Sequence, residues 1–232
     1  VDNARGLAEM GDLGDEVIER ADELDSAGNT TKAITKGFAI GAAGLTVIAL
    51  LAAFAEIVSS TTGEIITFDL MNPSVFFGAL VGVAIPAVFS AILIFGVNKN
   101  SQKLVSEIHR QFKEIKGIKE GTAQPEYAKC INLATLGAMT ELIPAGLSAI
   151  ISTLIVGFVG GVQAIGGFLA GNILSGLLLA MLMSNSGGLW DNAKKYIEAG
   201  NFGGKGSEAH KAAVIGDTIG DPFKDTAGPS IN

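Results

Sequence analysis

Two stretches without any charged side chain limit what this sequence can fold into. Residues 73–97 and residues 142–183 contain no Asp, Glu, Lys, Arg or His. As a single helix, the second stretch would be roughly twice as long as a bilayer core is thick. It must therefore fold back on itself, and Gly160, Gly161 and Gln163 mark the expected turn. Stretches of this kind predict an all-α membrane protein.

Four segments are apolar enough and long enough to cross a bilayer as helices. Residues 37–58 form a further apolar run that only Glu56 interrupts. Apolar residues make up 48% of the chain and charged residues 17%, whereas a typical soluble domain is about 25% charged. We therefore expect a polytopic helical bundle. Its predicted membrane spans are residues 37–58, 73–97, 140–160 and 164–184.

The basic residues predict the orientation of these spans. Segment 98–129 and the tail 185–232 are rich in Lys and Arg, whereas loop 59–72 has neither. Positively charged loops remain in the cytoplasm. We therefore expect residues 1–35, 98–129 and 185–232 to lie on the cytoplasmic side, where their polar side chains can form one site.

Local patterns predict the elements that flank the spans. Residues 28–31 (Gly-Asn-Thr-Thr) are expected to break the helix and to cap the next one, with the first span beginning near Lys36. Apolar residues recur at helical spacing between Leu104 and Ile115, so the second span is expected to continue as an amphipathic helix. Residues 117–125 are expected to form a loop.

Small residues recur at a spacing of four inside the spans. Such pairs allow two helices to approach closely in lipid, so we expect them to serve packing. Pro86 and Pro144 are expected to kink their spans, and Trp190 to lie at the membrane interface. The glycine pairs are Gly37/Gly41, Gly78/Gly82, Gly157/Gly161 and Gly167/Gly171.

Composition excludes several classes of protein. The one cysteine, Cys130, excludes an internal disulfide framework and is expected to be a small packing residue. A net charge of −7 does not favour nucleic-acid binding. The chain opens with neither a basic signal-peptide region nor an initiator Met, so we expect it to be part of a longer protein.

Three carboxylates near the end of the chain are the strongest candidates for chemistry. Asp217, Asp221 and Asp225 recur at a spacing of four, which stacks them on one face of a helix. Like charges at this spacing repel by a few tenths of a kcal/mol, and a bound cation reverses that cost. Oxygen ligands of this kind suit Mg²⁺. Gly216 and Gly220 precede two of the three and are expected to leave room for a ligand.

A second cluster adds positive charge. Asp191, Lys194 and Lys195 share one helical face, and Lys224 lies beside the acidic row. Carboxylates for a metal next to lysines for an anion suggest a phosphate site at the membrane surface. Alone, the acidic row is also compatible with a solvated helix face, and the second cluster with an ordinary helix N-terminus that Asp191 caps and surface lysines follow. Pro222 disfavours helical geometry at the residue before it, so we expect a kink there.

Five motifs together resemble the ion-pumping membrane pyrophosphatases. The resemblance covers most of the chain, in the same order and without a gap in any motif. It implies the C-terminal part of a roughly sixteen-helix fold, with two concentric rings of helices and a homodimer. The motifs are residues 2–10, 28–33, 190–198, 204–211 and 216–230.

The resemblance also implies a function. It implies hydrolysis of inorganic pyrophosphate with Mg²⁺, coupled to proton translocation out of the cytoplasm. The protein would be a multi-pass protein of a bacterial or archaeal inner membrane or of an acidic organelle, with a cytoplasmic active site and no nucleic-acid partner. The family's earlier acidic motifs and its ion gate are absent from this sequence, so we expect the segment alone to be inactive.

Individual residues acquire roles from the same resemblance. Asp225 matches a carboxylate that holds and activates the attacking water. Lys194, Lys195 and Lys224 match lysines at the phosphate oxygens. The matches to magnesium ligands are Asp2, Asn29, Asp191, Asp217 and Asp221.

Two further residues bear on potassium. In the resembling family, Lys and Thr at the positions of Lys32 and Thr35 accompany potassium independence, a class associated with proton pumping. The Lys32 ammonium would lie where the potassium ion otherwise lies. By its chemistry alone, Lys32 would be a lysine that extends to the membrane interface.

Two other functions compete with the enzyme. The carboxylates of a secondary cation transporter or channel would bind the transported ion without phosphate chemistry, and a membrane scaffold would use only its glycine-rich helices. Transporter sites usually lie near the midplane of the membrane. Here the acids lie outside the apolar runs or at their ends, beside paired lysines, which favours a surface site for a phosphate substrate.

Overall fold

The computed structural model describes residues 2–11 and 13–231, and within them it contains helices and loops but no strand. Three helices have windows long and apolar enough to cross a membrane, which confirms the predicted all-α membrane fold. They are α2 (Asp15–Thr62), α3 (Pro73–Glu114) and α4 (Tyr127–Glu198). The shorter elements are α1 (Asp2–Met10), η1 (Asn201–Gly203), α5 (Glu208–Pro222), the π-helical turn η2 (Phe223–Ala227) and α6 (Gly228–Ile231).

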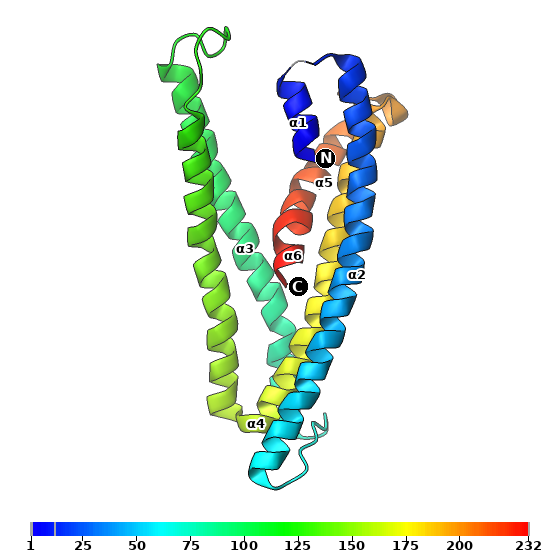
Figure 1. Ribbon diagram of the computed structural model, residues 1–232, viewed down its shortest axis with the longest axis vertical. Helices are drawn as coiled ribbons and strands as arrows, with labels where there is room; N and C mark the ends of the chain where they lie inside the picture. Colours follow the sequence, from blue (N-terminus) through cyan, green and yellow to red (C-terminus); the bar gives the residue numbers. More distant parts are fainter. Residues whose placement is uncertain (1, 12, 232) are drawn as a thin grey trace.

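Helix α4 consists of two arms. Gly161 has φ 67° and ψ −167°, a backbone conformation that only glycine adopts readily. In Figure 1 the first arm runs along α3, turns at the bottom of the view and returns beside α2. The turn lies where the sequence placed it. The three long helices therefore provide four rods.

The rods form two pairs that meet at the turn of α4. One pair is α3 with the first arm of α4, and the other is α2 with the second arm (Figure 1). The pairs diverge toward the opposite end, where α5 and α6 lie between them and α1 lies beside α2. The charged segments of the chain lie at that end, with residues 98–129 on one pair and α1, α5 and the end of α4 on the other (Figure 1).

Glycine contacts explain how closely α3 approaches the second arm of α4. A methyl group on Gly78 would collide with the carbonyl oxygen of Ala164, and one on Gly167 would collide with that of Val75. Gly82 and Gly171 make matching contacts with Phe168 and Ala79. These two pairs serve helix packing, as the sequence predicted. The expectation is not met at Gly37/Gly41, because a methyl group on either has no atom within 4 Å in the described chain.

The predicted helix break at residues 28–31 is wrong. Helix α2 passes through this run without interruption. The hydroxyls of Thr30 and Thr31 donate to the carbonyl oxygens of Ser26 and Ala27, at 3.3 Å and 2.9 Å, inside the helix. A helical glycine costs about 1 kcal/mol, and contacts between α2 and α4 outweigh this cost. The predicted amphipathic extension is present, because α3 continues to Glu114.

The glycine contacts generate a prediction about packing. Replacing Gly167 with Val should force α3 and α4 apart and destabilise the protein by about 1–3 kcal/mol, the usual cost of overpacking. Thermal unfolding of the detergent-purified protein measures this loss. Gly41→Val is the control, since its position is open. Equal melting temperatures for the Gly167 variant and the wild type would contradict the packing role.

Candidate functional site

Four elements bring charged and polar residues together at the open end of the two pairs. Asp25, Asn29, Lys32 and Lys36 follow one another at spacings of four, three and four, so they share one face of α2. The end of α4 contributes Asp191 and the lysines after it. Helix α5 and the turn η2 contribute the acidic row and Lys224.

The Asp191 carboxylate is the centre of the site. It is 4% exposed, and it accepts hydrogen bonds from Asn29 Nδ2 at 2.8 Å and from Lys224 Nζ at 2.5 Å. The Lys195 ammonium lies 3.1 Å from its other oxygen. Burial raises the pKa of Asp191, but the hydrogen bonds from Lys224 and Lys195 outweigh burial and lower it to about 2. Asp191 is therefore ionised at neutral pH and links α2, α4 and η2.

Asp217 has a different environment. One of its carboxylate oxygens accepts a hydrogen bond from Lys194. The other oxygen, Oδ1, is buried and has no hydrogen-bond partner. Burial raises the pKa of Asp217, the Lys194 hydrogen bond opposes that increase, and the nearby Asp221 carboxylate adds to it. A buried carboxylate oxygen without a donor is a position that a cation would stabilise.

Asp191, Asp217 and Asp221 together offer a cation site. One carboxylate oxygen from each lies within 4.8 Å of the other two. This set of hard oxygen donors, with one oxygen unpartnered, fits a divalent ion such as Mg²⁺. Lys224 Nζ lies 3.0 Å from Asp221 Oδ1 and balances part of the negative charge.

Asp225 does not continue the row, contrary to the sequence expectation. Its carboxylate lies 3.8 Å from Lys32 Nζ on α2 and is half-exposed. After Pro222 the helix widens into the π-helical turn η2, and the wider turn changes the direction in which the next side chains point. The side chains of Asp217 and Asp221 therefore lie together, as their spacing predicts, whereas the side chain of Asp225 faces Lys32.

The expectation that Gly216 and Gly220 leave room for a ligand is also wrong. Both glycines lie against the Trp190 ring, and Gly220 additionally contacts Gly187 on α4. Trp190 packs against Phe223 with ring centroids 6.0 Å apart, so it does not serve only as an interface residue. These small residues let α5 approach α4 and so bring the acidic row next to Asp191.

Sequence reasoning missed Asp25. Its side chain is 2% exposed, and its carboxylate accepts a hydrogen bond from Lys195. The Lys195 ammonium therefore lies between two carboxylates, those of Asp25 and Asp191. A signal was present, because Asp25 lies one helical turn before Asn29 and a continuous α2 places both on the site face.

The structure gives separate outcomes for two other predicted residues. Asp2 begins α1, and its side chain lies outside the described residues. The Thr35 hydroxyl donates to the carbonyl oxygen of Thr31 within α2 and is exposed.

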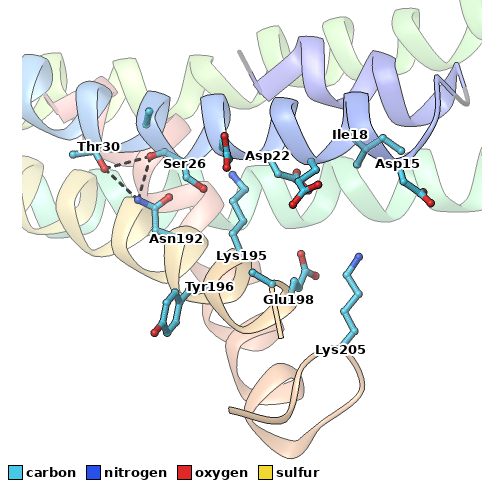
Figure 2. A pocket seen from close by; sticks show the side chains of 14 residues that line it. Asp15, Ile18, Asp22, Ser26, Thr30, Asn192, Lys195, Tyr196, Glu198 and Lys205 are labelled. Atoms are coloured by element: carbon cyan, nitrogen blue, oxygen red, sulfur yellow. Dashed lines mark hydrogen bonds between the residues drawn. The ribbon is translucent and has the colours of Figure 1, made fainter. Parts of the chain in front are cut away.

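Cavities lie next to the cluster. Figure 2 shows the larger one, of about 800 Å³, between α2 and the end of α4, where Asn192 donates to Ser26 and to Thr30. A second cavity, of about 230 Å³, reaches the site itself and is lined by charged residues only. Its lining residues are Arg5, Glu9, Asp25, Asp191, Lys194, Lys195, Glu198 and Lys205.

Sequence comparisons identify the family to which the chain belongs. The family model described as "Inorganic H+ pyrophosphatase" matches residues 1–232, which is the whole chain. The chain belongs to this family. The family assignment confirms the resemblance drawn from the five motifs.

Several curated members of the inorganic H+ pyrophosphatase family are similar to the whole of this chain. The chain is 50% identical over 231 residues to a "K(+)-insensitive pyrophosphate-energized proton pump" of Methanosarcina mazei and covers 34% of that protein. It is 49% identical to "K(+)-insensitive pyrophosphate-energized proton pump 2" of Moorella thermoacetica, again covering 34%. It is 48% identical to a "K(+)-stimulated pyrophosphate-energized sodium pump" of Thermotoga maritima, covering 33%. The chain thus spans about a third of these relatives, and its overall identity does not separate the two kinds of pump.

Asp191 provides a pH-dependent test of the site. Because its folded-state pKa of about 2 lies below the ordinary 3.8, ionised Asp191 stabilises the fold above about pH 4, and this contribution is lost as the pH falls toward 2. Asp191→Asn should therefore cost about 2 kcal/mol at pH 7, and the cost should shrink in acid. Denaturant unfolding of the detergent-purified protein across this range measures it. A cost that does not change with pH would contradict the assigned ion pairs.

Proposed function

We propose that this chain forms part of the cytoplasmic hydrolytic site of a membrane pyrophosphatase that cleaves inorganic pyrophosphate with Mg²⁺ and couples cleavage to proton translocation out of the cytoplasm. The observation that carries this proposal is the meeting of three carboxylates with three lysines from distant segments. The names of the relatives support the substrate. The activity belongs to the full-length homodimer in its membrane, and the segment alone is expected to be inactive.

Substrate binding follows from the charges of the site. Asp191, Asp217 and Asp221 would hold the magnesium, with Asn29 and Asp2 completing the ligand set. When bound, the ion supplies charge neutralisation for the phosphate oxygens. The ammonium groups of Lys194, Lys195 and Lys224 now pair with carboxylates, and phosphate oxygens would become their new acceptors.

Hydrolysis then needs a placed water more than a covalent intermediate. The half-exposed Asp225 carboxylate would hold that water and accept its proton as the oxygen attacks one phosphorus. The bond from that phosphorus to the bridging oxygen breaks, and the bridging oxygen leaves with the second phosphate. Lys224 lies next to Asp225 in the chain, so one turn carries both the proton acceptor and a phosphate contact.

Lys32 supports potassium independence and therefore proton transport. Its ammonium lies 3.8 Å from Asp225, and a fixed positive charge at this place does the work of a bound monovalent cation. Thr35 lies three residues after Lys32 in the same helix, α2. Relatives named K(+)-insensitive and K(+)-stimulated are about equally similar overall, so the proposal of potassium independence rests on Lys32 and Thr35 alone.

A secondary cation transporter is the alternative. The same carboxylates would then bind a transported ion. The three lysines oppose this alternative, because a cation path does not need them and a phosphate does. The charged cluster also lies beyond the apolar spans of α2 and α4, rather than at their middle.

The proposal predicts an enzymatic activity. Membranes that carry the full-length protein should release phosphate from pyrophosphate only when Mg²⁺ is present, and Asp225→Asn should lower kcat about 10²–10⁴-fold through loss of the general base. Colorimetric phosphate release measures both. Absence of release, or release that Asp225→Asn leaves unchanged, would favour the transporter.

A separate prediction concerns potassium. Hydrolysis by the wild-type full-length protein should be similar with and without K⁺, because the Lys32 ammonium already provides the charge. The double variant Lys32→Ala, Thr35→Gly should require K⁺ for activity. A K⁺ titration of both proteins is the measurement. A wild-type enzyme that is inactive without K⁺ would contradict the assignment.

A further inference from the structure

Lys36 makes a contact that the proposed mechanism does not use. It is partly buried on α2, and its ammonium donates a hydrogen bond to the main-chain carbonyl oxygen of Lys224 in η2. The contact therefore connects α2 to the backbone between two residues of the proposed reaction, Lys224 and Asp225.

The Lys224 carbonyl needs this donor because the backbone of its own helix does not supply one. In an α-helix the N–H of Gly228 would donate to it. In the π-helical turn that N–H donates to Phe223 instead. The next possible backbone donor is residue 229, which is a proline and has no N–H. The wide turn and Pro229 together leave this carbonyl free for Lys36.

The direction of two side chains depends on the same turn. Lys224 is 4% exposed and extends to Asp191 and Asp221, whereas Asp225 faces Lys32. In regular α-helical geometry Asp225 would instead continue the row of Asp221. Whatever holds the turn in its wide form therefore holds both side chains in place.

We propose that Lys36 is a positioning residue for the hydrolytic site, and that its hydrogen bond to the Lys224 carbonyl oxygen holds η2 in the form that directs Lys224 and Asp225. The inference rests on the proposed function. Lys36 acts through the backbone of the turn rather than by touching substrate. The three metal-site carboxylates lie on α4 and α5, outside the turn, so the backbone that carries them does not depend on Lys36.

The test uses steady-state kinetics of the full-length protein. Lys36→Met removes the donor but keeps a long side chain, and it should lower kcat about a hundredfold, as expected for a misplaced catalytic group. The Mg²⁺ concentration for half-maximal activity should change far less than kcat, because the backbone that carries Asp191, Asp217 and Asp221 belongs to α4 and α5 and not to the turn. Lys36→Arg, which keeps a donor, should retain most of the activity. Lys103→Met, on the exposed face of α3, is the matched control and should match the wild type.

A second variant tests the mechanism itself. Pro229→Ala supplies a main-chain N–H near the free carbonyl, so it should raise the kcat of Lys36→Met about tenfold, the value of one hydrogen bond. If Lys36→Met fails to accumulate in the membrane, the double variant should restore both accumulation and activity. A role of Lys36 through its charge alone would give no such rescue.

Three results would overturn the inference. They are an unchanged kcat in Lys36→Met, a loss of kcat that is matched by weaker Mg²⁺ dependence, and a Pro229→Ala change that rescues nothing. A wild-type protein without hydrolysis would contradict the proposed function instead. In that case, accumulation of the single and double variants would still test the contact between Lys36 and the turn.

Discussion

The charged end of this structure depends on the hydrogen bonds and ion pairs that the buried, ionised Asp191 carboxylate accepts. A buried carboxylate is costly unless its charge is compensated, and here three elements provide the donors. Asn29 comes from α2, Lys195 from α4 and Lys224 from η2. Each donor also fixes the position of its own element. The charge that would be hardest to bury alone thus determines how the elements of the site are arranged.

Close backbone contact makes this arrangement possible. Gly187 on α4 lies against Gly220 on α5, so the two helices approach without side chains between them. Trp190 then packs against the same stretch of α5 and against Phe223. The close approach explains why Asp217, in the middle of α5, is buried and why one of its oxygens lacks a donor.

Much of the fold was predictable because it follows from local chemistry. The uncharged runs determined the long helices, and Gly161 lies at the one place where the longest run must turn. Asp191, Asp217 and Asp221 could be found from their motifs, because helical spacing holds for them. Asp225 could not be placed, since its direction depends on a π-helical turn that spacing alone does not reveal. Asp25 was missed because residues 28–31 suggested a break in a helix that contacts with α4 keep continuous.

The continuity of α2 has a mechanical consequence. Its 48 residues form one rod about 70 Å long, with Asn29 and Lys32 toward one end and the apolar window toward the other. A helix without a break resists compression along its axis, because shortening it would break backbone hydrogen bonds. Any axial displacement of the charged end, such as a change of partners at Asp191, must therefore appear as motion of the apolar end. A continuous α2 thus provides a mechanical link between the charged cluster and the apolar window of the same helix.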